Sequence, residues 1–314
     1  MVTAVELGLI YAIMALGVYL TFRVLEFPDL TVDGSFATGA ALAAVMILNG
    51  TPPVIALLFA FIGGMVAGLV TGLLNTKGNI DGLLAGILTQ VALYSINLRI
   101  MGTPNIGLLR ATTIFTPLRD AGLIGSWYGP LIMAPFVLVI LGAFIWFLHT
   151  NIGLAMRGTG DSPDMVRSFG VSTDAQKILG LALSNGVVAL SGAVVAQYQG
   201  FADVGMGIGI IVAGLASVII GQAIVGRLTI WRAATAAVVG AVLYRVVIQL
   251  ALMLGFNPND MRLISAVLVI AALLIPQWKI PARLHVLLGL RKRTPEKRTE
   301  DRLIKENAAL DGEK

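Results

Sequence analysis

The chain has 314 residues, of which 57% are hydrophobic and 12% are charged, and its mean hydropathy is +0.88. A water-soluble domain is about half apolar and about a quarter charged, so this composition excludes a soluble globular protein and indicates that the bilayer is the solvent. The net charge of +5 is small and argues against a nucleic-acid partner, and the absence of cysteine excludes disulfides, thiolate metal sites and cysteine nucleophiles.

The apolar segments predict an all-α fold, a polytopic transmembrane helical bundle of about 8–10 spans, because each span needs about 20 mostly apolar residues. The expected spans are 4–22, 32–49, 53–74, 82–101, 130–149, 178–199, 207–226, 232–254 and 262–279. The second span begins with the polar, Gly-rich stretch TVDGSFATGA, so we expect a broken helix there. The stretch 102–129 contains Pro104 and Pro117 and is expected to be a long loop with one or two short pieces of structure.

Basic residues are unevenly divided between the two sides that nine spans create. One side holds nine of them: Arg23, Lys77, Arg157, Arg167, Lys177, Arg227, Arg232, Lys279 and Arg283. The other side holds four: Arg99, Arg110, Arg119 and Arg262. The positive-inside rule therefore predicts an N-terminus outside and a C-terminus in the cytoplasm. We expect a transmembrane domain at 1–285 and a charged cytoplasmic tail at 286–314.

The two halves of the chain suggest an inverted repeat. The first span carries Gly17 and Val18 and precedes GSFATGAALAAVMI, and the sixth carries Gly186 and Val187 and precedes GIGIIVAGLASVII. By the predicted orientation these units run in opposite directions, as in transporters that contain short broken helices. Runs of Gly, Ala and Val also resemble one another through composition alone, so both interpretations stay open.

A short charged segment, RGTGDSPDMVRSFGV at 157–171, interrupts the apolar chain on the predicted cytoplasmic side. It contains residues that favour the start of a helix, with Ser162 as N-cap, Pro163 at the first position and the negative charge of Asp164 in the first turn. Gly170 and the positive charge of Arg167 favour the end of the helix. It also contains an apolar cluster: Met165, Val166 and Phe169. A helix of about two turns is marginal alone in water, so we expect it to dock, either on its own protein or the lipid surface, or on a cytoplasmic partner.

Polar side chains at membrane depth are candidates for a solute path. Gln90, Tyr94 and Asn97 follow i, i+4, i+7 and form one polar stripe on the fourth span. The stripe either lines a passage or hydrogen-bonds neighbouring helices. Arg245 lies near the middle of the eighth span with Gln249 one turn further on. This arginine either meets the carboxylate of a solute or is structural, paired with a carbonyl group or an acid.

Other polar residues are expected to have structural roles. Ser184 and Asn185 are expected to pack between helices, and Asp33 to cap the second span near the cytoplasmic side. Glu6 and Asp203 are placed at span edges. The core spans then contain almost no acids, which counts against a transporter driven by an ion gradient.

No catalytic arrangement appears in the sequence. There are no paired carboxylates and no Ser/His/Asp or HExxH pattern, so we predict no catalytic residues, no metal site and no enzyme activity. The phosphate-binding pattern G-x-x-x-x-G-K-[ST] is also absent. We therefore predict no cofactor in this chain, and any ATP and Mg²⁺ would be bound by a partner subunit.

The stretch GLAMRGTGDSPDMVRSFGVSTDAQKILGLALSNGVVALSGAVVAQYQG resembles the central cytoplasmic loop and following span of ABC-importer permeases, in the branch of branched-chain amino-acid and ribose permeases. DLTVDGSFATGAA and GLASVIIGQAIVG…VGAVLYRVVIQLALMLGFNPNDMRLISAVLV resemble the tryptophan- and tyrosine-type permeases of that branch. The resemblance covers about residues 3–280. It implies a permease subunit of an ATP-driven importer in the bacterial inner membrane. The implied solute is small, an amino acid, with aromatic amino acids favoured.

The resemblance also implies partners. These are an ABC ATP-binding subunit inside, a solute-binding protein outside, and a second permease subunit, which we expect to be a second copy of this chain. The central loop after the Gly-x-Ala-x-Arg stretch, from Gly153 to Arg157, then carries the coupling helix, at about 161–170. The coupling residues implied are Arg157, Asp161, Ser162, Asp164, Met165, Val166, Arg167, Phe169 and Gly170. The alternative function is an ion-gradient-driven secondary transporter of a small organic solute.

Overall fold

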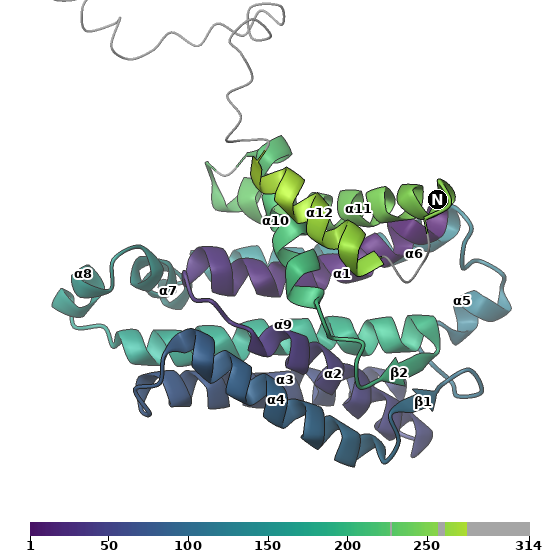
Figure 1. The fold of residues 1–314 in the computed structure, drawn as a ribbon, viewed down its shortest axis with the longest axis horizontal. Coiled ribbons are helices and arrows are strands. Elements are labelled where there is room, and N and C mark those ends of the chain that lie inside the picture. Colours follow the sequence, from purple (N-terminus) through teal and green to yellow (C-terminus); the bar gives the residue numbers. More distant parts are fainter. Residues whose placement is uncertain (227, 257–260, 275–314) are drawn as a thin grey trace, which may run out of the picture. The chain divides into compact units, whose positions relative to one another are not determined.

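The structure is a computed structural model that describes residues 1–226, 228–256 and 261–274. Their elements, in chain order, are α1 (Val2–Tyr19), the π-helix η1 (Leu20–Val24), α2 (Thr31–Leu48), α3 (Pro53–Thr76), α4 (Gly82–Met101), β1 (Asn105–Gly107), α5 (Thr116–Asp120), α6 (Tyr128–His149), α7 (Asn151–Asp161), α8 (Pro163–Ser168), α9 (Thr173–Gln199), β2 (Phe201–Asp203), α10 (Ile210–Val225), α11 (Ile230–Met253) and α12 (Met261–Leu274). Residues up to Ala272 form one unit, whose layout is visible in Figure 1.

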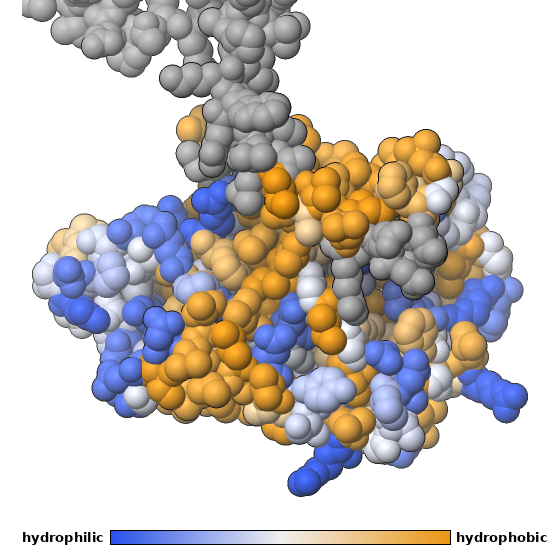
Figure 2. All heavy atoms as spheres, in the orientation of Figure 1, coloured by the Kyte–Doolittle hydropathy of each residue, from blue (hydrophilic) through white to orange (hydrophobic). Residues whose placement is uncertain are grey.

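Within the described residues, seven helical segments are long and apolar enough to cross a membrane: Val2–Val24, Thr31–Leu48, Pro53–Thr76, Gly82–Met101, Tyr128–His149, Thr173–Gln199 and Ile230–Met253. α10 is shorter, and the expected ninth span and the charged tail extend beyond the described residues. Figure 2 shows a hydrophobic belt with hydrophilic residues gathered toward the α7–α8 end and the opposite end. These features confirm the predicted all-α membrane fold.

The connections between spans fall into two groups. β1 follows α4, β2 follows α9, and the two strands pair antiparallel with Ile106 opposite Ala202. α7 and α8 lie at the other end of α9 (Figure 1). The predicted loop at 102–129 contains only β1 and α5 before α6 begins at Tyr128. α7 was not predicted, because its sequence, NIGLAMRGTGD, contains three glycines and two charged residues and so resembles a loop.

The core is built by close helix packing. α1 and α9 are antiparallel neighbours: the Ser184 hydroxyl donates to the Gly17 carbonyl at 2.7 Å, and Ser191 donates to Ile10 at 3.0 Å. On α3, Gly64 and Gly68 are so close to the α9 backbone that a Cβ atom would overlap it. Small residues thus bring the backbones together, as expected for helices that associate in a bilayer.

The core contains two structural units with the same order of elements. Each has a long helix (α1 or α9), an extended segment, a shorter helix (α2 or α10) and an antiparallel third helix (α3 or α11). The third helix of each unit packs on the first helix of the other, α3 on α9 and α11 on α1. This exchange agrees with the inverted-repeat interpretation.

The second span is not a broken helix, and this corrects the prediction. α2 is continuous from Thr31 to Leu48, and the irregular backbone precedes it, in η1 and the segment 25–30. Asp29, just before α2, contacts Asn185 in the middle of α9. α2 therefore begins partway along the bundle rather than at its end, as Figure 1 also shows. The polar residues that suggested a break are those buried around this start.

Candidate functional site

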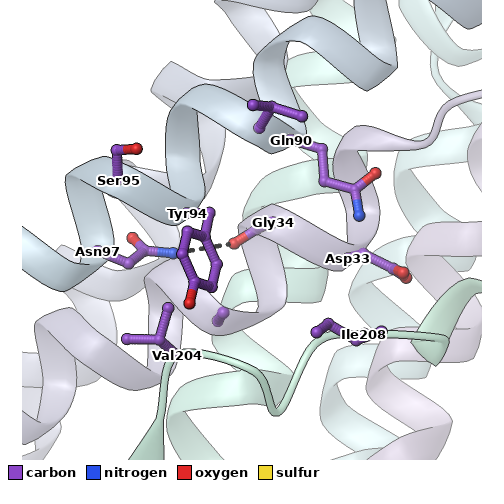
Figure 3. A pocket seen from close by; sticks show the side chains of 10 residues that line it. Asp33, Gly34, Gln90, Tyr94, Ser95, Asn97, Val204 and Ile208 are labelled. Carbon is purple, nitrogen blue, oxygen red and sulfur yellow. Dashed lines mark hydrogen bonds between the residues drawn. The ribbon is translucent and has the colours of Figure 1, made fainter. Parts of the chain in front are cut away.

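Two cavities lie on either side of the start of α10. The first, called the α4 cavity, has a volume of about 370 Å³ and is lined by Asp33, Gly34, Ala37, Gln90, Val91, Tyr94, Ser95, Asn97, Val204 and Ile208 (Figure 3). The second, called the α11 cavity, has a volume of about 270 Å³ and is lined by Ile208, Gly209, Ile210, Val212, Ala213, Tyr244, Arg245, Ile248, Ser265 and Ala266. Ile208 lines both, so the two cavities adjoin.

The α4 cavity brings together the predicted polar stripe. Gln90, Tyr94 and Asn97 all line it, facing α2 and the segment that leads to α10. Asn97 is fully buried, and its amide nitrogen is 3.5 Å from the Gly34 carbonyl oxygen. Its Oδ1 atom has no hydrogen-bond partner in the described part of the chain. The stripe therefore contributes only weakly to hydrogen bonding between helices.

Arg245 lines the α11 cavity. Its guanidinium carbon lies 3.5 Å from the centroid of the Tyr11 ring, a cation–π contact that joins α11 to α1. Among the described residues the guanidinium has neither the carbonyl nor the acidic partner that a structural role predicted, and its buried Nε atom is unpaired. Gln249 is half-buried and lines neither cavity.

Asp33 lines the α4 cavity, and its predicted role is corrected. Its carboxylate does not cap its own helix. It accepts hydrogen bonds from the backbone N–H groups of Gly209 and Ile211, each at 2.8 Å, and so caps α10. A carboxylate at a helix N-terminus satisfies unpaired donors and the helix dipole together. Sequence reasoning missed this partner because α10 lies more than 170 residues further along the chain.

Two further acids are buried: Glu6, which was predicted at a span edge, and Asp29. Glu6 accepts from the Gly125 N–H at 3.0 Å and the Tyr198 hydroxyl at 2.5 Å. Asp29 accepts from the Thr31 N–H at 2.9 Å and the Asn185 amide at 2.7 Å. Burial raises the pKa of Asp29, and these hydrogen bonds partly oppose that rise. The core is thus less poor in acids than predicted, although each acid has protein donors.

The predicted coupling segment forms a helical hairpin of α7 and α8. α7 contains Arg157 and ends at Asp161, and Ser162 separates it from the six-residue α8, which is shorter than the two turns expected. Ser162 occupies the N-cap position with an extended backbone, but its side chain makes no capping hydrogen bond. Gly170 ends the segment with φ of +79°, as predicted.

The hairpin exposes most of its apolar cluster. Val166 is buried against Gly158, whereas Met165 is 50% and Phe169 77% exposed. The predicted cluster therefore does not pack as a unit on its own protein. Arg167 binds the Thr173 hydroxyl at 2.9 Å and lies 3.5 Å from the exposed carboxylate of Asp164, a surface pair that contributes little stability.

A polar groove of about 450 Å³ lies beside the hairpin. Its lining residues come from the end of α3, the α3–α4 connection, α8 and the start of α9: Asn75, Thr76, Asn79, Ile80, Asp81, Arg167, Asp174 and Lys177. The hairpin also rests on η1, since a Cβ atom at Gly160 would overlap the Val24 carbonyl. Among the residues that the structure describes, no cluster of three His, Asp or Glu side chains could hold a metal ion.

Sequence comparison finds relatives over nearly the whole chain. The family model described as branched-chain amino acid transport system / permease component matches residues 1–273. The chain is 43% identical over 267 residues to the tyrosine transport system permease protein of Clostridioides difficile (strain R20291), which covers 85% of this chain and 88% of that protein. It is 34% identical over 278 residues to an uncharacterized protein of Rickettsia prowazekii (strain Madrid E), covering 87% and 96%.

Structural comparison finds an ABC transporter. The fold is similar to an inward-facing conformation of a metal-chelate type ABC transporter, with a TM-score of 0.50 and 15% sequence identity, over 89% of this chain and 84% of that chain. At this identity the likeness bears on the fold alone. It agrees with the transmembrane architecture expected from the sequence.

Proposed function

The chain belongs to the family of branched-chain amino acid transport system permease components, and from this premise we propose that it is the membrane subunit of an ATP-driven amino-acid importer. In this proposal a separate ABC ATP-binding subunit docks on the α7–α8 hairpin, and a solute-binding protein delivers the solute from the other side. The second permease subunit is a second copy of this chain. ATP and Mg²⁺ are bound by the ATPase.

The exposed hairpin carries the proposal. Phe169 and Met165 present apolar surface at an end of the bundle where the neighbouring groove is polar. Gly170 fixes where α8 stops, so the position of Phe169 is specified rather than free. Exposed aromatic and Met side chains beside polar residues are typical of protein interfaces. This arrangement supports a docked partner over a helix lying on its own protein.

The contacts of the hairpin supply a route for coupling. Gly160 touches Val24 at the end of η1, and the next residues lead to buried Asp29 and the start of α2. π-helical turns occur frequently at functional sites. A displacement of the hairpin by the ATPase would therefore act on the start of α2, which borders the α4 cavity through Asp33 and Gly34.

The α4 and α11 cavities are the proposed solute path. The stripe of Gln90, Tyr94 and Asn97 offers hydrogen-bonding groups and one half-exposed aromatic ring, which suit an aromatic amino acid. The named activity of the Clostridioides difficile relative, tyrosine transport, supports the same solute class. The family and its bacterial relatives support an inner-membrane location. The charge distribution supports an orientation with the hairpin in the cytoplasm, the N-terminus outside and the C-terminus inside.

Co-purification with the ATPase tests the proposal. Phe169→Asp places a charge in the docking surface, and we expect loss of most ATPase recovery and of ATP-driven uptake in proteoliposomes, because an unpaired buried charge is strongly unfavourable. Trp127→Asp is the matched control, since Trp127 is also an aromatic residue with 77% exposure, next to α6 at the opposite end. Unchanged recovery and uptake in the Phe169 variant would reject the docking role. Uptake that persists without any ATPase would favour the ion-gradient-driven alternative.

A further inference from the structure

The guanidinium of Arg245 packs on a stack of two aromatic rings. It lies over Tyr11, whose ring stacks on Phe36 with centroids 5.9 Å apart and planes inclined by 21°. Both rings are buried. Stacking uses a face of the guanidinium and leaves its N–H groups, which point outward in the plane, for acceptors. The arginine is therefore pre-oriented for a planar anion such as a carboxylate.

The described part of the chain supplies no anion to this arginine. The buried acids of α1 and α2, Glu6 and Asp33, both accept other hydrogen bonds. No described acid lies within ion-pair distance of Arg245. An arginine within a membrane bundle normally has a partner, because an unpaired charge there is costly.

The α11 cavity offers an anion few other donors. Three N–H groups at the start of α10 are already used: those of the N-cap Gly209 and of Ile211 by Asp33, and that of Ile210 by the Gly207 carbonyl at 3.1 Å. Beyond these, the Tyr244 hydroxyl is hydrogen-bonded to Ser265 at 2.6 Å. Among the described lining residues, Arg245 is thus the single cationic side chain of the cavity.

Resting on the proposed function, we propose that the α11 cavity is the subsite for the carboxylate group of the transported amino acid, with Arg245 as its ligand. At about 270 Å³ the cavity is smaller than a typical site for a whole ligand and suits one end of a small solute. The rest of the solute faces the α4 cavity across Ile208, where Tyr94 and the Asn97 oxygen lie, the latter unpaired among the described residues. The arginine thereby distinguishes amino acids from the corresponding amines.

The test compares ligands with and without a carboxylate. The permease is reconstituted in nanodiscs, and the binding of L-tyrosine, L-leucine and tyramine is measured for wild type, Arg245→Met and Arg245→Lys. We expect Arg245→Met to weaken binding of both amino acids about tenfold to a hundredfold, because one charge-assisted contact is lost. Tyramine binding should be unchanged, and Arg245→Lys should be intermediate. Arg232→Met, at the exposed start of the same helix, is the matched control.

Each other outcome overturns the inference. Equal losses for tyramine and the amino acids would mean that Arg245 only supports the fold. Wild-type affinity in Arg245→Met, or no amino-acid binding by the wild type, would remove the subsite. Nanodiscs with and without phosphatidylglycerol distinguish a solute carboxylate from a lipid phosphate as the ligand of Arg245. If the arginine binds a lipid phosphate, Arg245→Met will leave amino-acid binding unchanged. If the wild-type complex shows ATP-driven uptake and the Arg245→Met complex shows the same uptake, this inference is refuted while the proposed function stands.

Discussion

The starts of α2 and α10 are equivalent places in the two structural units, yet they are stabilised differently. Before α2, Asp29 binds Asn185, and the Asn185 oxygen accepts from Ser35 at 2.6 Å, so the start of α2 is tied to α9. The Thr31 and Thr71 hydroxyls, 2.7 Å apart, add a tie to α3. The start of α10 is held by Asp33, through two backbone N–H groups, and has a cavity on each side.

This difference separates a scaffold from an element that is free to move. Displacing the start of α2 would break a closed network of buried side chains, and each unsatisfied group costs about 1–3 kcal/mol. Displacing the start of α10 breaks the two hydrogen bonds to Asp33 and moves Ile208, which lies between the α4 and α11 cavities. We therefore expect α10 and the segment before it to change position relative to the rest of the bundle during transport, while α2 keeps its contacts with α9 and α3 and moves with them when the hairpin moves.

The largest effect is expected at Asn185. Asn185→Ala removes the donor to Asp29 and the acceptor for Ser35, and leaves both groups buried without these partners. We expect a loss of about 3 kcal/mol or more in the free energy of unfolding, measured by thermal or denaturant unfolding in detergent. Asn49→Ala, at the exposed end of α2, is the control. Similar stability of the two variants would mean that the start of α2 is not the fixed region.

An intermediate effect is expected at Asp33. Asp33→Ala leaves the Gly209 and Ile211 N–H groups without acceptors, so we expect a loss of about 2 kcal/mol and a more mobile α10. Because the chain has no cysteine, Ile208→Cys gives a single labelling site. Maleimide labelling of that cysteine should rise several-fold in Asp33→Ala and depend on ATP in the full complex.

A buried cysteine near the start of α2 provides the comparison for this experiment. Phe27→Cys lies in the segment before α2, where the native side chain is buried against Gly82. Its labelling should stay slow in the presence or absence of ATP, because the network around Asp29 holds the segment closed. Equal responses at positions 208 and 27 would contradict the assignment of a rigid and a moving start.

The smallest effect is expected at Asp29. Asp29→Asn keeps the size of the side chain but loses one acceptor, at a cost of about 1 kcal/mol. The pKa of Asp29 is raised by burial, so the folded state binds its proton more tightly than the unfolded chain does. Stability should therefore fall as the pH rises from about 3.8, the ordinary value, through the raised pKa, and level off above it. Asp29→Asn should lack this component, and identical pH profiles for the two proteins would contradict it.

Much of the fold was predictable because it depends on local composition. The apolar run predicts the fourth span at 82–101, where α4 lies, and in the structure Asp81 caps its start and Gly102 its end. The stripe of Gln90, Tyr94 and Asn97 was also predictable, because helical spacing alone puts these residues on one face. The hairpin was predicted only in part: Gly170 and Pro163 behave as expected, whereas α7 resembles a loop in sequence and the capping role of Ser162 was wrong.

Local sequence was sufficient to indicate the bilayer as solvent, the positions of the spans and the place of the hairpin, because apolar runs and helix-terminating residues act over a few positions. Tertiary structure alone decided that Asp33 caps α10, that Asp29 and Glu6 are buried with donors, and that Arg245 stacks on Tyr11. The physical reason is that a buried polar group must find its partner in space. Here Asp29 has one local donor, the Thr31 N–H, and the other partners of the three acids lie 119 to 192 residues away along the chain.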